Sequence, residues 1–231
     1  MNKFSIAIIV YALGINSLLF QPAHAGILTL DNFSHAQQIV DNGKTPGASS
    51  NSVNNLTGTD LHTVTRQFIA EASNGKQAYQ TKIDIKPDSG IMAISNDPKS
   101  AVLASVLWSF QPIDFTEHGD TLSFDIKQLN LGVNIEFIVN GISSSGIKSF
   151  TDAGNVEVSF NDFSQPSQFG NISSLRLNFT GPGSWDGQFG PLSIVNRSTP
   201  ETIGSVPLPP SFLLMASSLI GLVTIPRSKK S

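Results

Sequence analysis

The middle of the chain alternates hydrophobic and polar residues with a period of two. Residues 79–86 are the clearest case, because Tyr79, Ile83 and Ile85 alternate with polar or charged side chains. Successive side chains of a β-strand point to opposite faces of the sheet, so this pattern predicts a strand with one buried face. The same criterion predicts strands at 27–30, 61–69, 102–110, 122–126, 133–139, 156–160, 175–179 and 192–195.

Turn sequences separate these predicted strands, among them Asn140-Gly141 and Gly181-Pro182-Gly183. No segment between Gly26 and Pro200 keeps a helical period. Many short strands joined by polar turns are typical of an antiparallel β-sandwich, which we predict for residues 26–195. A jelly-roll-like topology is expected, because its two sheets bury many half-apolar strands and leave few exposed edges.

Two segments of this region are so polar that we predict no strand or helix in them. Residues 41–59 are rich in Asn, Ser and Gly and are expected to form a mobile loop. Residues 196–205 are polar and include Pro200, and we interpret them as a flexible stalk.

The N-terminal residues have the pattern of a signal peptide. Lys3 precedes an apolar run over residues 4–20, and Ala23-His24-Ala25 provides the small residues that signal peptidase requires. We therefore predict a signal peptide over residues 1–25 with cleavage before Gly26. An uncleaved N-terminal anchor is the alternative interpretation.

The C-terminal residues combine a proline motif, an apolar run and a basic cluster in that order. Val206-Pro207-Leu208-Pro209 precedes the apolar residues 212–225, and these are followed by Arg227, Lys229 and Lys230. A transmembrane helix is predicted over the apolar run, although the run is short for a permanent span. Basic residues favour the cytoplasmic side, so the preceding domain is expected outside the cytoplasm. A plain C-terminal anchor with a proline-rich neck is the alternative.

Residues 206–231 resemble the PEP-CTERM class of sorting signals, in the variant with the motif Val-Pro-Leu-Pro-Ala. Val206, Pro207, Leu208 and Pro209 match that motif, and Pro210 stands where the family has Ala. The resemblance implies a Gram-negative bacterium, a transient inner-membrane intermediate, and processing by an exosortase-type membrane protease. It also implies a destination at the cell surface or in the extracellular matrix, linked to exopolysaccharide or biofilm.

A second resemblance concerns the first predicted strand. Asp31-Asn32-Phe33-Ser34 is similar to the Asp-x-Phe-Ser sequence that opens a family of exported bacterial β-sandwich proteins with the same type of tail. This resemblance implies a sandwich and identifies no ligand.

Charge and cysteine content narrow the classes of partner and chemistry. Only 10 of the 14 Lys and Arg residues lie between Gly26 and Ser205, against all 17 Asp and Glu residues. Nucleic acid is therefore not an expected partner, because its recognition depends on basic patches. The chain has no cysteine, which excludes disulfides and thiol catalysis, so burial of apolar surface must supply the stability.

The sequence contains no catalytic motif that we recognise, and we expect no catalytic residues and no cofactor. Trp185 and Asp186 lie in a Gly-rich loop and are the candidate ligand-binding residues. An exposed Trp185 ring would stack on a sugar, whereas a buried ring would cap the end of the sandwich, and the second arrangement is the more common. A structural calcium ion is the one metal to consider, with Asp31, Asn32 and Asp186 as oxygen donors.

Three functions therefore remain open at this point. The first is a structural or adhesive surface protein, the second a carbohydrate-binding module, and the third an exported enzyme acting on glycans. An exposed Trp185 in a groove would favour carbohydrate binding, and a convergent pair of carboxylates in a cleft would favour the enzyme.

Overall fold

The computed structural model describes residues 26–72, 79–98, 100 and 103–197. The strands are β1 (Leu28–Asp31), β2 (Gln37–Asp41), β3 (Ser49–Val53), β4 (Thr65–Glu71), β5 (Thr81–Ile85), β6 (Met92–Asn96), β7 (Leu103–Ile113), β8 (Thr121–Leu129), β9 (Val133–Val139), β10 (Ser143–Phe150), β11 (Gly154–Ser159), β12 (Ile172–Thr180) and β13 (Asp186–Val195). Three short 3₁₀ helices complete the fold, η1 (Phe115–Glu117), η2 (Phe160–Asp162) and η3 (Pro166–Asn171).

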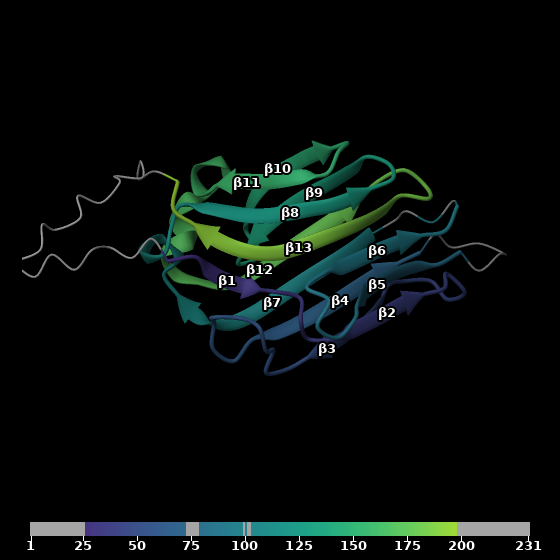
Figure 1. The fold of residues 1–231 in the computed structure, drawn as a ribbon, viewed down its shortest axis with the longest axis horizontal. Coiled ribbons are helices and arrows are strands. Elements are labelled where there is room, and N and C mark those ends of the chain that lie inside the picture. The colour runs from purple at the N-terminus through teal and green to yellow at the C-terminus, as the bar shows by residue number, and fades with distance from the viewer. Residues whose placement is uncertain (1–25, 73–78, 99, 101–102, 198–231) are drawn as a thin grey trace, which may run out of the picture.

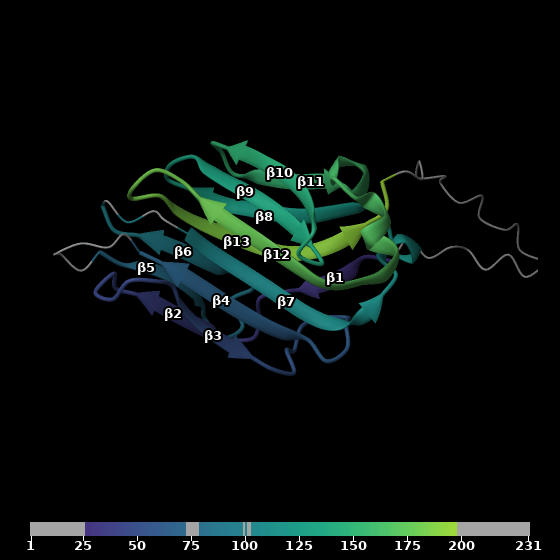
Figure 2. The same ribbon diagram turned by 180° about the vertical axis from the view of Figure 1, so that it is seen from behind.

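These strands form two antiparallel sheets that pack face to face (Figure 1). The seven-stranded sheet has the order β11-β8-β13-β6-β5-β2, and β1 also pairs with β13. The six-stranded sheet has the order β10-β9-β12-β7-β4-β3 (Figure 2). The predicted β-sandwich is therefore confirmed.

The core between the sheets consists of the inward residues of the alternating strands. In β5, Thr81, Ile83 and Ile85 are buried while the residues between them are partly exposed, as the sequence pattern predicts. Phe124 of β8 stacks on Phe189 of β13 with ring centroids 5.4 Å apart, and large apolar side chains from both sheets continue this layer. With no disulfide available, this burial is the main stabilising contribution.

The prediction of a loop over residues 41–59 is wrong in part, because β3 lies within it. Among the described strands, β3 pairs with β4 alone at the edge of its sheet, and its side chains are exposed or half-buried. An edge strand of this kind needs no apolar alternation, so its sequence resembles a loop. The buried carboxylate of Asp41 holds the segment in place, because it accepts hydrogen bonds from Ser49 Oγ at 3.2 Å and from the Ala72 backbone N–H at 2.7 Å.

The two ends of the described domain lie side by side, because Leu28 of β1 pairs with Ile194 of β13. The predicted stalk begins in contact with the domain, since Arg197 forms an ion pair with Glu157. The predicted signal peptide and sorting segment, including the motif at 206–209 and the basic residues after it, lie outside the described residues. Within the described ranges we find no helix that is both long and apolar enough to cross a membrane.

Candidate functional site

A row of polar side chains crosses the outer face of the seven-stranded sheet. The strand register places Gln38 beside Asp84, Asp84 beside Ala93, Ala93 beside Gln188, and Gln188 beside Gln128. Gln38, Asp84, Ala93 and Gln188 point outward, because the residues that flank them along each strand are buried in the core. Gln128 is also exposed, at a β-bulge where the register between β8 and β13 shifts. Segments far apart in the sequence thus contribute to one line of hydrogen-bonding groups, interrupted only by the small Ala93.

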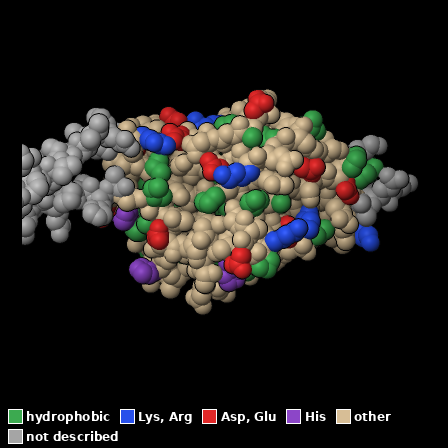
Figure 3. Space-filling view, in the orientation of Figure 1, with side chains coloured by type: hydrophobic (Ala, Val, Ile, Leu, Met, Phe, Trp, Pro, Cys, Tyr) green, Lys and Arg blue, Asp and Glu red, His purple; other side chains and the backbone are tan. Residues whose placement is uncertain are grey.

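The small side chain of Ala93 leaves a depression in this row. Two cavities of about 190 and 170 Å³ adjoin here, and both are bounded by Ala93 and Gln188. We call the combined depression the groove. Its remaining polar lining residues are Asp84, Lys86, Ser89, Ser95, Gln128, Asn130 and Asp186. Figure 3 shows this face, on which charged and hydrophobic side chains are scattered.

The carboxylates that line the groove are held in fixed positions. Asp84 accepts a hydrogen bond from Gln38 Nε2 at 2.9 Å and pairs with Lys82 at 3.3 Å. Asp186 accepts hydrogen bonds from the Asn96 backbone N–H at 3.0 Å and from Asn130 Nδ2 at 3.2 Å.

The two glutamines of the groove differ from its carboxylates in having no internal partner. In the part of the chain that the structure describes, neither Gln128 nor Gln188 makes a side-chain hydrogen bond. Each amide offers two donor hydrogens and one acceptor oxygen. The groove therefore presents available amides between carboxylates that are already oriented.

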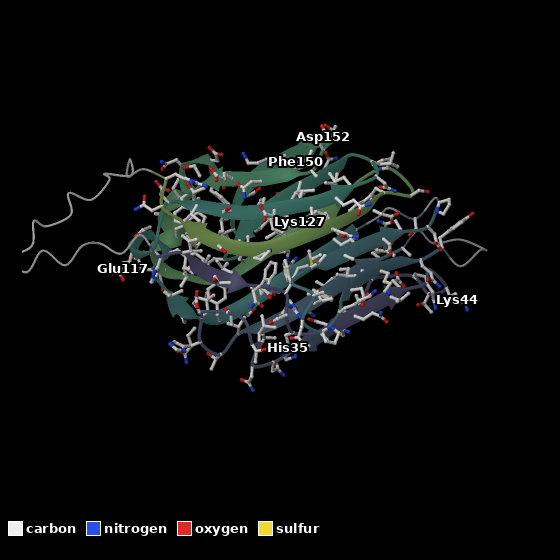
Figure 4. The ribbon with its side chains drawn as sticks, in the orientation of Figure 1. His35, Lys44, Glu117, Lys127, Phe150 and Asp152 are labelled. Carbon is white, nitrogen blue, oxygen red and sulfur yellow. The ribbon has the colours of Figure 1, made fainter. Side chains whose placement is uncertain are left out.

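An ion pair borders the groove where β8 and β13 lie side by side. Lys127 Nζ lies 2.7 Å from Asp125 Oδ2, and Figure 4 shows Lys127 near the middle of this face. The hydrogen bond from Lys127, followed by one from Asn155, lowers the pKa of the Asp125 carboxyl below its ordinary value, against a smaller opposing effect of burial. The pair covers Gly190, where an added Cβ would lie 2.7 Å from Lys127 Cε, so a larger residue there would require the lysine side chain to move.

Trp185 is buried, with 1% of its surface exposed. The ring packs against Gly181, where an added Cβ would lie 2.7 Å from Trp185 Cδ1, and the Trp185 carbonyl accepts a hydrogen bond from Asn96 Nδ2 at 2.8 Å. The interpretation that the ring caps the sandwich is confirmed, and the hypothesis that it stacks on a sugar is wrong. Its neighbour Asp186 is exposed and lines the groove.

The proposed calcium ligand Asp31 is fully buried, and both of its carboxylate oxygens are occupied. Oδ1 accepts a hydrogen bond from the Phe33 backbone N–H, while Oδ2 accepts from Arg66 Nη1 at 2.7 Å and from Trp108 Nε1 at 2.8 Å. The Arg66 guanidinium supplies the positive charge that a calcium ion would otherwise supply, so the calcium hypothesis is wrong for Asp31.

The other two proposed calcium ligands do not join Asp31 in a metal site. Asn32 Oδ1 accepts a hydrogen bond from the Ser34 backbone N–H, and Asp186 lines the groove. Among the described residues, no group of three or more His, Asp or Glu side chains is placed to hold a metal ion.

No protein-family model and no curated protein matches this chain. Among solved structures, it is similar to a family 11 carbohydrate-binding module from Clostridium thermocellum in complex with a beta-1,3-1,4-mixed-linked tetrasaccharide, at 14% identity and a TM-score of 0.39, over 74% of this chain and 96% of that one. It is also similar to a solution structure of CtCBM11, at 14% identity and a TM-score of 0.42, over 74% and 95%. A family 29 carbohydrate-binding module matches at 10% identity and a TM-score of 0.34, over 69% and 88%. Likenesses this remote carry no inference about what this chain binds.

Proposed function

We propose that this chain is an exported surface or matrix protein whose β-sandwich, of jelly-roll type, binds polysaccharide in the groove. The observation that carries the proposal is the cross-strand row from Asp84 to Gln128, which is hollowed at Ala93. Neighbouring strands lie about 4.8 Å apart, so the row from β5 to β8 extends over about 14 Å and can contact several sugar units of one chain.

The chemistry of the groove suits the hydroxyl groups of sugars. A hydroxyl both donates and accepts hydrogen bonds, and it therefore pairs well with the amides of Gln128 and Gln188 and with the carboxylate oxygens of Asp84 and Asp186. Because none of the described residues that line the groove is aromatic, recognition depends on hydrogen bonds more than on stacking. We assign the groove a role in binding rather than catalysis.

Replacing Gln188 by Ala should weaken glycan binding without unfolding the protein. The side chain lies at the centre of the groove, and losing its hydrogen bonds to a ligand should reduce affinity by up to about tenfold. The full chain and the variant would be compared on a glycan array, followed by titration with the neutral oligosaccharide that binds best. Ser193→Ala, elsewhere on β13, is the matched control and should bind as the unmodified chain does. Equal binding of neutral glycans by Gln188→Ala, or binding to no neutral glycan on the array, would refute the proposal.

Delivery to the surface rests on the sequence motifs at both ends of the chain. We propose that the signal peptide is removed after Ala25, and that an exosortase-type protease processes the chain at the Val206–Pro209 motif. Protein extracted from the cell surface should therefore have an intact mass that lacks the basic residues 227–230. Recovery of surface protein that still carries Ser231 would contradict processing.

A further inference from the structure

A second cleft lies on the opposite side of the sandwich from the groove, on the outer face of the six-stranded sheet. It has a volume of about 380 Å³ and opens over the middle strands β7, β9 and β12. Its lining residues include Leu107, Ser109, Ile138, Asn140, Ser174 and Arg176. The register places Arg176 between Leu107 and Ile138, and Ser174 beside Ser109. We call this depression the arginine cleft.

One wall of the arginine cleft is rigid. Asn140 Oδ1 accepts hydrogen bonds from the backbone N–H groups of Ser173 at 2.9 Å and Ser174 at 3.2 Å. Asn140 Nδ2 donates to the Asn171 carbonyl at 3.0 Å and to Gln168 Oε1 at 3.1 Å. These bonds tie the turn after β9 to the start of β12, so the cleft keeps its shape without a ligand.

Arg176 has no ion-pair or hydrogen-bond partner among the described residues, whereas the other described arginines, Arg66 and Arg197, are both paired. Its side chain is half-buried, so it has lost part of its hydration. Glu136, a diagonal neighbour on β9, is engaged with Ser144 Oγ at 2.6 Å and with Asn178 Nδ2 at 3.3 Å. A partly desolvated, unpaired guanidinium is costly, and an anionic ligand would offset that cost.

We propose that the arginine cleft binds the carboxylate of an acidic polysaccharide, that is, of a uronic acid unit. The planar guanidinium of Arg176 matches a carboxylate in a two-bond arrangement. The hydroxyls of Ser109 and Ser174, which make no side-chain hydrogen bond in the described structure, can bind sugar hydroxyls. Leu107 and Ile138 on either side of Arg176 offer apolar contact for the face of a sugar ring.

The position of the cleft favours a glycan over an acidic peptide. Extended peptides commonly bind by pairing with a free sheet edge, where main-chain groups are available. Here the strands are internal, because β12 pairs with both β7 and β9, and these pair in turn with β4 and β10. A ligand must therefore be recognised by side chains alone.

Two binding sites on opposite faces of one sandwich would let a single molecule bridge two polysaccharide chains. This bridging role rests on the proposed function of the groove, whereas carboxylate binding by Arg176 does not. The arrangement would give an exported protein an adhesive role in a matrix, since joining two chains through paired sites multiplies the strength of attachment.

The test compares binding of the full chain to polygalacturonate and to the fully methyl-esterified polymer, which keeps the sugar and removes the charge. We expect binding to the acid form that weakens as salt is added. Arg176→Gln should reduce that affinity about tenfold or more. The affinity of Arg176→Lys should lie between those of the unmodified chain and Arg176→Gln, because lysine keeps the charge without the planar guanidinium. Lys44→Gln is the charge-matched control and should bind normally. It removes an exposed cation that forms no ion pair among the described residues and lies at one end of the molecule, far from this sheet face.

Several outcomes would overturn the proposal. Equal binding of the acid and esterified polymers would show that Arg176 does not bind a carboxylate. An equal loss of affinity in Lys44→Gln and Arg176→Gln would show the same. Binding of poly-glutamate as tight as that of polygalacturonate would assign the cleft to acidic peptides. The result is separable from the groove, because Gln188→Ala should leave polygalacturonate binding at Arg176 intact. If the protein binds polygalacturonate through Arg176 but binds no neutral glycan, only the proposed function of the groove is refuted.

Discussion

Replacing Arg66 by Met should lower the free energy of unfolding by about 3–5 kcal/mol, since removing one partner of a buried ion pair leaves the other charge uncompensated. Both side chains of the Arg66–Asp31 pair are fully buried. Arg66 also donates to Gln37 Oε1 at 2.8 Å and to the His35 carbonyl at 2.6 Å, so the substitution leaves several buried acceptors without their donor. Methionine fills much of the same volume, which limits the contribution of a new cavity.

Denaturant titration of the full chain would measure this loss. The control is Arg197→Gln, which breaks the Arg197–Glu157 pair, whose side chains are 58% and 37% exposed. Exposed pairs contribute at most about 1 kcal/mol. A loss in Arg66→Met no larger than that in Arg197→Gln would show that the buried pair does not organise this end of the core.

Replacing Trp185 by Ala should also cost about 3–5 kcal/mol, the range for large aromatic side chains removed from a core. The ring is 1% exposed and packs against Gly181, and the backbone carbonyl of Trp185 accepts a hydrogen bond from Asn96 of β6. The effect should therefore be structural, with a lower denaturation midpoint and, in the folded protein, glycan binding that still depends on Gln188.

Gln188→Ala provides the comparison for this variant, because its side chain is on the surface and its removal should change stability by no more than about 0.5 kcal/mol. Unchanged stability of Trp185→Ala together with a complete loss of glycan binding would mean that the ring reaches the ligand, against its buried position.

The strands with strict alternation could be predicted from the sequence because their period reflects burial on one face. β5 and β9 follow this rule, and both were expected within a few residues of their bounds. β2, β3, β6 and β10 were not expected. β3 and β10 are sheet edges with Ser-rich sequences and few buried side chains. β2 and β6 are short, and buried polar residues (Gln37, Asp41 and Asn96) interrupt their apolar alternation. Such segments form strands because they pair with a neighbouring strand, and their own composition does not predict this.

The candidate site could be predicted only in part. Asp186 was singled out from its loop and does line the groove, but Gln188, Ala93 and Asp84 were not, because their proximity depends on the register of strands far apart in sequence. Asp31 was misinterpreted for the same reason. Its partner Arg66 is 35 residues away, and an acidic residue near a chain end resembles a metal ligand until that partner is placed.

The most direct test of polysaccharide binding in the groove is an NMR titration of the full chain that follows side-chain amide signals. On addition of the neutral oligosaccharide that binds best on the array, the signals of Gln128, Gln188 and Asn130 should shift together, while that of Asn140 on the opposite sheet should not. Shifts confined to residues outside β5, β6, β8 and β13, with these three amides unchanged, would contradict the assignment of the groove as the binding site.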